Sequence, residues 1–247
     1  ARGDAPTIRA ALEDALPAVD VVVQSGATPR RKKLIVADMD STMIGQECID
    51  ELADEAGVGA RVKDITARAM NGELDFDGAL RERVGLLKGL PENVIAKVLA
   101  ERITLMPGGK TLVATMKANG GTAALVSGGF TAFTGSVAAS LGFDENRANT
   151  LLAEAGQLTG KVAMPILGRE AKVQALHEIT ARLGLAASDV LAVGDGANDL
   201  GMLGLAGTGV ALHAKPSVQA QCDIRINHGD LTALLYIQGY ARSEFAA

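Results

Sequence analysis

The sequence predicts an α/β fold in which a doubly wound parallel sheet carries a small helical-bundle insert and a β-hairpin. Three observations support this prediction. Short β-branched runs alternate with helix-length amphipathic stretches, which is typical of βαβ units and a parallel sheet. Glycine is frequent, with 29 of 247 residues, and aromatic residues make up only 3%, which favours α/β turns over an aromatic-rich β-sandwich. Residues 47–105 keep a helical period throughout, with no strand pattern among them.

Composition and charge exclude several classes of protein. With 48% apolar and 21% charged residues, the chain has the profile of a globular protein. Its net charge of −5 argues against a broad surface for nucleic acid. Two cysteines, Cys48 and Cys222, are too few for a disulfide framework and indicate buried thiols in a reducing compartment. We find neither a signal peptide nor an apolar run near the ~20 residues of a membrane span, so we expect a cytoplasmic protein that does not bind membranes.

The first 105 residues divide into three parts. Residues 1–30 combine a short helical pattern with the strand-like run VDVVVQ, residues 19–24, and the missing initiator Met suggests the remnant of a longer N-terminal region. The run KKLIVAD, residues 32–38, predicts a buried parallel strand whose C-terminal end opens onto a site. Residues 47–105 then show four short apolar helix faces, which predict a small helical bundle inserted into the sheet domain.

Residues 31–46 and 106–247 are expected to form the sheet domain. A helix from Pro107 should end at the glycines of ANGG, after which TAALVS predicts a strand and GGFTAFTGSVAASLGF the next helix. A weak two-strand pattern over residues 148–165 predicts a hairpin. The alternation continues to the C-terminus with a helix from about Glu170 to Leu183, strand VLAVGD, helix ANDLGMLGLAG, strand TGVAL, a helix from Pro216, strand DIRI and a helix from Leu231.

Two carboxylates stand at the end of the first strand of the sheet domain, in the motif DMDST, residues 38–42. Side chains at i and i+2 of an extended chain point the same way, so Asp38 and Asp40 should face one crevice. Ligands bind at this C-terminal edge of parallel sheets. An ordinary strand-to-helix turn, with Asp or Ser capping the helix, explains the motif about equally well.

A second acidic strand end lies in VGDGAND, where Asp195 and Asp199 are four residues apart and can face one point in space. An acidic first helical turn, favoured by the helix dipole, is the simpler interpretation. Two acidic ends on one sheet nevertheless require a cation, and oxygen ligands select a hard one, Mg²⁺. The three histidines are scattered and offer no zinc spacing.

Two weaker signals suggest an anion site. Ser127-Gly128-Gly129 follows a strand, and a hydroxyl with free backbone N–H groups at a helix N-terminus can hold an anion. By itself the triplet is better explained as a tight turn. Lys172 follows the predicted hairpin, where a phosphate-binding cation would fit the chain order, although a single helical lysine usually lies on the solvated face.

DMDST, SGG, Lys172 and GDGAND, in this order around a helical insert, resemble the motifs of haloacid dehalogenase-like phosphatases. The insert stretches ECIDELA, AMNGELDF and LRERVGLLKGL are similar to those of the phosphoserine phosphatase branch of that group. The similarity runs from about Lys33 to the C-terminus. It implies a Rossmann-like core of the haloacid dehalogenase type, in which the insert is a cap over the site.

The resemblance also implies an activity. The expected reaction is Mg²⁺-dependent hydrolysis of a small molecule, O-phospho-L-serine, to L-serine and phosphate through an aspartyl-phosphate, as the last step of serine biosynthesis. Asp38 would be the nucleophile and Asp40 the general acid and base. The implied metal ligands are the Asp38 and Asp195 carboxylates and the Asp40 carbonyl, with Asp199 ordering a metal-bound water. The implied substrate-binding residues are Ser127, Gly128, Lys172 and Asn198 for the phosphate, Glu47 for the ammonium, Arg83 for the carboxylate, and Met70 and Phe76 to close the pocket.

Three other functions remain open at this point. In the first, the chemistry is the same but the substrate is another phosphorylated amino acid or a small metabolite such as a sugar phosphate. Glu47 together with Arg83 favours a zwitterionic amino acid over a sugar. A non-catalytic amino-acid sensor on the same fold is disfavoured because every catalytic position is filled. A phosphoacceptor receiver domain also uses Mg²⁺ and an aspartate, but the helical insert and the acid two residues after Asp38 argue against it. A homodimer also remains open.

Overall fold

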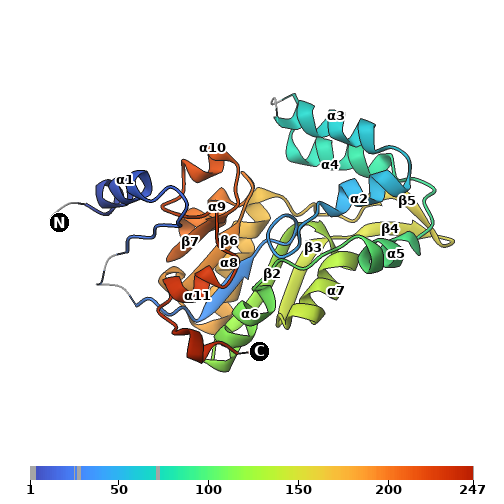
Figure 1. Ribbon diagram of the computed structural model, residues 1–247. Coiled ribbons are helices and arrows are strands. Elements are labelled where there is room, and N and C mark those ends of the chain that lie inside the picture. The colour runs from blue at the N-terminus through green and yellow to red at the C-terminus, as the bar shows by residue number, and fades with distance from the viewer. Residues whose placement is uncertain (1–3, 25, 27–28, 71–72, 247) are drawn as a thin grey trace.

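Six parallel strands form the main sheet of the computed structural model, which describes residues 4–24, 26, 29–70 and 73–246, the side chains of residues 69 and 70 excepted. The strand order is β3-β2-β1-β6-β7-β8, which confirms the predicted doubly wound sheet (Figure 1). The strands are β1 (Leu34–Ala37), β2 (Thr122–Phe130), β3 (Glu145–Asn149), β6 (Val190–Gly194), β7 (Thr208–Leu212) and β8 (Ile224–Ile226).

The winding direction reverses at β1, which pairs with β2 on one side and with β6 on the other. Ala37, the last residue of β1, lies opposite Leu125 of β2 and Val193 of β6. Ligands of open α/β sheets bind at such a reversal, outside the carboxyl ends of the strands. The residues that directly follow β1 and β6 therefore occupy the expected binding position.

Helices cover both faces of the sheet because the side chains of each strand alternate between two hydrophobic cores. Ile35 packs into one core with α6, α7 and α11, whereas its neighbours Leu34 and Val36 pack into the other with α8, α9 and α10. The bounds of these helices are α6 (Gly109–Ala118), α7 (Thr131–Leu141), α8 (Arg169–Leu183), α9 (Leu200–Leu205), α10 (Pro216–Gln219) and α11 (Ala233–Ile237). An N-terminal helix, α1 (Ala5–Ala15), and two 3-10 turns, Ala187–Asp189 and Arg242–Glu244, complete the elements of this part.

Four helices separate β1 from α6, and Figure 1 shows them set to one side of the sheet. They are α2 (Cys48–Glu55), α3 (Gly59–Met70), α4 (Phe76–Gly85) and α5 (Val94–Glu101). Asp75 begins α4 as its N-cap, because its side chain accepts the Gly78 N–H at 2.7 Å. The two connections to the sheet domain run side by side, since the Gly45 N–H donates to the Thr104 carbonyl at 3.0 Å.

The predicted hairpin is confirmed as the antiparallel pair β4 (Leu151–Glu154) and β5 (Gln157–Val162). It is hydrogen-bonded to the helical insert, because the Gly89 N–H donates to the Leu158 carbonyl and the Leu158 N–H donates to the Leu90 carbonyl. The hairpin therefore extends from the sheet to the insert.

Three details of the sequence prediction were wrong. Residues 19–24 form no strand. The valines of this run predict burial, and Val22 does pack against the core. The run forms no strand ladder; instead, the Asp20 side chain accepts the backbone N–H groups of residues 227–229. Residues 128–130, expected at the start of the next helix, instead continue β2. The strand β3 was missed because its sequence, ENRAN, is polar and suits the edge of a sheet.

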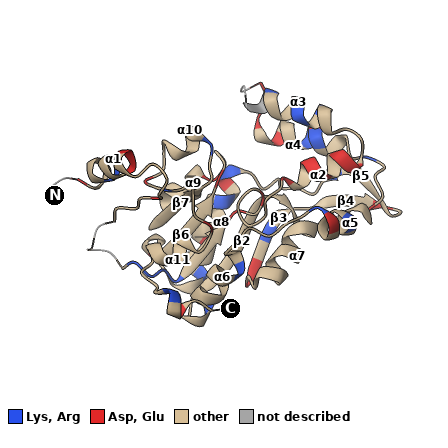
Figure 2. Ribbon diagram, viewed as in Figure 1, with Lys and Arg blue, Asp and Glu red and all other residues tan. Residues whose placement is uncertain are grey.

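The described residues contain no helix that is long and apolar enough to cross a bilayer. In the view of Figure 2, lysines and arginines are interspersed with aspartates and glutamates along the helices.

Candidate active site

Three carboxylates meet where β1 and β6 end. Asp38 follows β1, Asp195 follows β6, and Asp199 is the N-cap residue of α9. One oxygen from each lies within 4.8 Å of the others, and Asp38 and Asp199 are only 5% and 0% exposed. Because all three donors are carboxylate oxygens, two of them on buried residues and one on the half-buried Asp195, the cluster fits a hard divalent cation.

Lys172, from the first turns of α8, neutralises part of this charge. Its Nζ lies 2.7 Å from Asp38 Oδ2 and 2.6 Å from Asp199 Oδ1, and the residue is 2% exposed. Burial alone lowers the pKa of Lys172, but the two carboxylates outweigh it and the net pKa is raised. The side chain is therefore a permanent cation in the site and does not lie on the solvated face that single helical lysines usually occupy.

Burial raises the pKa of Asp38 well above its usual range, and Asp199 adds to this effect while Lys172 opposes it. The Asp38 carboxylate is also oriented, since Oδ1 accepts the Met39 N–H at 2.7 Å. A cation held by the cluster would favour the ionised form of all three aspartates.

Asp195 is oriented by Thr42, the last residue of the DMDST motif, for which the sequence predicts no role. The Thr42 hydroxyl, fully buried, donates to Asp195 Oδ1 at 2.9 Å. Burial raises the pKa of Asp195 to about 6. A threonine after an acidic motif carries no sequence signal of its own, because its partner lies far along the chain.

The Asp40 side chain is directed at a different part of the site. Its Oδ2 would lie 2.7 Å from a Cβ built on Gly129, so the carboxyl group lies close against this glycine, and its Oδ1 accepts the Cys48 N–H at 3.4 Å. Burial and the nearby Glu47 raise the pKa of Asp40 to about 7. A carboxyl group with this pKa is partly protonated near neutral pH, which suits a general acid.

The segment Ser127–Gly129, which we call the serine loop, lies beside Asp40. It belongs to the end of β2, and α7 begins only at Thr131, so the expected helix N-terminus at this triplet is wrong. The Gly129 N–H is also not free, because it donates to the Ser127 Oγ at 2.9 Å. In this segment, the Ser127 hydroxyl and the Gly128 N–H are therefore the candidate donors to an anion.

The helical insert reaches this loop through Phe76, the first residue of α4. A Cβ built on Gly128 would lie 3.2 Å from the Phe76 ring, and one built on Gly168 would lie 3.0 Å from it. The Asn198 amide nitrogen is 3.9 Å from the same Gly128 position. The structure therefore brings together Phe76, Gly128 and Asn198, three residues to which the resemblance assigns substrate binding.

Glu47 and Arg83 are the two charged residues of the insert to which the resemblance assigns substrate binding, and both lie near other carboxylates of the site. Glu47 precedes α2, is exposed, and accepts the Ser41 hydroxyl at 2.7 Å. Arg83 is half-buried, and burial lowers its pKa while Asp50, Glu47 and Asp40 oppose the shift, so these carboxylates lie within electrostatic range of it. The side chain of Met70 lies outside the part of the structure that is described.

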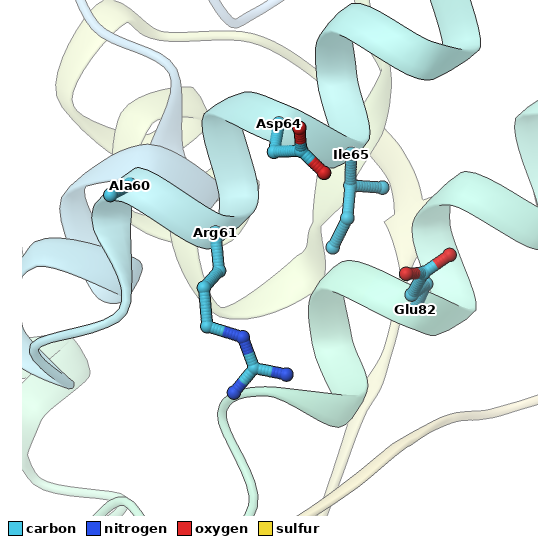
Figure 3. A pocket seen from close by; sticks show the side chains of 5 residues that line it. All are labelled: Ala60, Arg61, Asp64, Ile65 and Glu82. Carbon is cyan, nitrogen blue, oxygen red and sulfur yellow. The ribbon is translucent and has the colours of Figure 1, made fainter.

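Two open hollows elsewhere contain none of the predicted residues. One of about 460 Å³ lies between the insert and the hairpin, and is lined by Pro91, Glu92, Asn93 and Gly156. The other, of about 370 Å³, lies on the surface of α3 and α4 (Figure 3), and is lined by Ala60, Arg61, Asp64, Ile65 and Glu82. Neither combines a carboxylate cluster with a buried cation, so the strand ends remain the best candidate site.

Comparisons with known proteins agree with this geometry. Residues 35–204 match the family model of haloacid dehalogenase-like hydrolases. A phosphoserine phosphatase of Streptomyces coelicolor is 44% identical over 96% of this chain, which spans 58% of that relative's length. A phosphoserine phosphatase of Streptococcus thermophilus is 46% identical over 83% of this chain and 95% of that relative. A solved substrate-bound phosphoserine phosphatase complex superposes with a TM-score of 0.78 at 42% identity, over 83% of this chain and 98% of the other.

Proposed function

Because the chain belongs to the haloacid dehalogenase-like hydrolases, and within them to the phosphoserine phosphatase family, we propose that it hydrolyses O-phospho-L-serine to L-serine and phosphate with Mg²⁺. The observation that carries this proposal is the carboxylate cluster of Asp38, Asp195 and Asp199, in which Lys172 bridges the two buried members, Asp38 and Asp199. The reaction would complete serine biosynthesis. The two buried free cysteines suit a reducing compartment such as the cytoplasm.

The first chemical step is attack of an Asp38 carboxylate oxygen on phosphorus, which forms an aspartyl-phosphate and breaks the bond to the serine oxygen. Asp38, Asp195 and the Asp40 backbone carbonyl would hold Mg²⁺, with Asp199 beside it. The bound ion would supply the positive charge that lets an anionic nucleophile approach an anionic phosphate. Asp40, with its pKa raised to about 7, gives its proton to the departing serine oxygen.

In the second step water attacks the aspartyl-phosphate. Asp40, now a carboxylate, removes a proton from this water, and phosphate leaves while Asp38 is regenerated. Acid and base assistance of this kind contributes about 10²–10⁴-fold in rate. Asp40 can act in both steps because its side chain lies beside the serine loop and outside the carboxylate cluster.

Charge on the transferring phosphoryl group is stabilised by donors fixed before substrate arrives. The Ser127 hydroxyl, the Gly128 N–H, the Lys172 ammonium and the Asn198 amide are proposed for this role. Ser127 and Lys172 are each 2% exposed, so water competes little with their hydrogen bonds to an anion.

The helical insert, residues 47–105, is proposed to act as a cap over residues 31–46 and 106–247. A cap that closes excludes water during the first step, and its opening admits water and releases product. The close approach of Phe76 to Gly128 and Gly168 supports this role. Glu47 would bind the substrate ammonium, Arg83 its carboxylate, and Met70 would complete the wall.

Activity should depend on Mg²⁺. Phosphate release from O-phospho-L-serine is expected to stop after chelation, to return with Mg²⁺ and to return poorly with Ca²⁺, which takes more ligands at longer distances. A second readout is the melting temperature of the metal-free protein, which Mg²⁺ should raise by neutralising the cluster. Full turnover after exhaustive chelation would contradict the metal assignment.

Arg83→Ala should change substrate preference. It removes a planar donor for the substrate carboxylate, so kcat/KM for phosphoserine should fall. The corresponding loss of transition-state stabilisation should be about 2–4 kcal/mol. An aryl phosphate without a carboxylate should be hydrolysed almost as before. Arg83→Lys should restore only part of the loss, because an ammonium lacks the two-pronged geometry.

The matched control is Arg81→Ala, on the same helix, whose exposed side chain contacts Met164 of the sheet domain. It should leave the ratio of the two substrates unchanged. Equal losses on both substrates for Arg83→Ala, together with a lower melting temperature, would reject the carboxylate role and make Arg83 a structural residue.

A further inference from the structure

Asn149, the last residue of β3, is a buried polar residue to which the proposed reaction gives no role. It is 2% exposed, and its carboxamide forms three hydrogen bonds. Its Nδ2 donates to the Gly128 carbonyl at 2.8 Å and to the Leu167 carbonyl at 3.2 Å, while its Oδ1 accepts the Leu167 N–H at 2.8 Å. One side chain thus joins the serine loop to the segment that leads into α8.

The first link orients the serine loop. The Gly128 carbonyl and the Gly129 N–H belong to one planar trans peptide group, so they point in opposite directions. Asn149 holds the carbonyl end, and the N–H end donates to the Ser127 Oγ at 2.9 Å. Fixing this peptide group therefore fixes the Ser127 oxygen as an acceptor, which leaves its hydroxyl proton to donate to another group.

The second link fixes the start of α8. Leu167 is bonded to Asn149 in both directions, α8 begins two residues later at Arg169, and Lys172 lies within its first turn. A shift of Leu167 would move the helix start, and with it the Nζ that bridges Asp38 and Asp199.

The same two links support the contact with the insert. Gly128 and Gly168 are the two glycines against which Phe76 lies, and each is at or next to a residue that Asn149 holds. Asn149 therefore fixes the distance between the two surfaces on which the aromatic ring rests.

We propose that Asn149 is a positioning residue that sets the spacing between the serine loop and Lys172, and so the affinity of the site for the phosphate group. This inference rests on the proposed function, because it takes Ser127 and Lys172 as phosphate donors. Asn149 acts on the phosphate end of the substrate only, so its removal affects every phosphomonoester by the same factor.

The test uses inorganic phosphate as the probe, measured as a competitive inhibitor of aryl phosphate hydrolysis with Mg²⁺ present. Asn149→Ala removes all three hydrogen bonds. Asn149→Asp keeps the size of the side chain and can accept the Leu167 N–H, but as a carboxylate it cannot donate to Gly128. A misplacement of about 1 Å costs about 10²-fold in rate, so kcat for phosphoserine and for the aryl phosphate should both fall by about this factor, and phosphate should bind about tenfold more weakly.

Gln238→Ala is the matched control. Gln238 is a carboxamide that is 1% exposed, accepts the Lys32 N–H at 3.0 Å and donates to the Leu234 carbonyl at 3.2 Å. Its loss should lower the melting temperature yet keep phosphate affinity and kcat within about twofold, because the two sites share no partners.

Wild-type phosphate affinity in a folded Asn149 variant would overturn the inference. So would failure of both Asn149 variants to fold while Gln238→Ala folds, because Asn149 would then be required for stability. A wild-type protein that binds phosphate and cleaves the aryl phosphate but not phosphoserine would contradict the proposed substrate alone, and the phosphate measurements would still decide the role of Asn149.

Discussion

Asp38→Asn should reduce turnover of phosphoserine by at least about 10⁴-fold while the protein stays folded, because loss of a catalytic nucleophile has effects of this size. A neutral amide cannot attack phosphorus. The substituted side chain has the same size and can still accept the Met39 N–H, and Lys172 keeps its bond to Asp199. The variant should therefore melt cooperatively and lose activity without losing structure.

Mass spectrometry provides a second readout for this variant. Wild-type protein quenched in acid during turnover should carry one phosphoryl group on the peptide that contains Asp38, and Asp38→Asn should carry none. Asp144→Asn is a suitable control because Asp144 is an exposed carboxylate paired with Lys117 at 2.7 Å, at the amino ends of the strands and not at the carboxyl ends that form the site. More than a small fraction of wild-type turnover in a pure Asp38→Asn sample would exclude Asp38 as the nucleophile.

Lys172→Met should reduce both activity and stability. The variant loses a phosphate donor, which we expect to lower kcat by about 10³-fold. It also leaves Asp38 and Asp199 buried without their cation, and breaking a buried ion pair costs about 3–5 kcal/mol of folding free energy. Mg²⁺ should restore part of the melting temperature, since the ion neutralises the same carboxylates, but it should not restore turnover.

The stability loss of Lys172→Met should depend on pH. Without the lysine, the pKa of Asp38, already raised by burial and by Asp199, should rise further. The folded state then binds more protons than the unfolded chain, whose aspartates have a pKa of about 3.9. Stability of the metal-free variant should consequently fall as pH rises above about 4, and recover on acidification.

Lys32→Met separates these effects from the general cost of removing a buried lysine. Lys32 is 6% exposed, but its Nζ donates to the carbonyls of Pro29 and Ser188, away from the carboxylate cluster. Its substitution should lower the melting temperature and leave kcat unchanged. Near-normal turnover by Lys172→Met would show that the lysine balances charge but does not contact the phosphoryl group.

The carboxyl ends of β1 and β6 could be predicted because each combines an apolar run with acidic residues, and parallel strands bring such ends together. This pattern located Asp38, Asp195 and Asp199 near one another, as the structure has them. The polar edge strand β3 could not be predicted in this way, since ENRAN has neither alternation nor β-branched residues. Asn149 was missed with it.

Contacts between residues far apart in the chain were the other part that the sequence did not reveal. The interpretation of Lys172 as a phosphate ligand came from chain order, whereas its bonds to Asp38 and Asp199 depend on how α8 packs against the sheet. Thr42 and Asp195 are 153 residues apart, so their hydrogen bond has no local signature. The serine loop was placed at a helix start because glycines punctuate helices and strands alike.

Phosphate release from a panel of phosphomonoesters, with and without Mg²⁺, tests the central claim most directly. The panel should contain O-phospho-L-serine, a phosphorylated amino acid with another side chain, a sugar phosphate and an aryl phosphate. We expect the highest kcat/KM for O-phospho-L-serine, no release without a divalent cation, and none from Asp38→Asn. Equal or faster release from the sugar phosphate, or no release from O-phospho-L-serine by folded, Mg²⁺-loaded protein, would contradict the account.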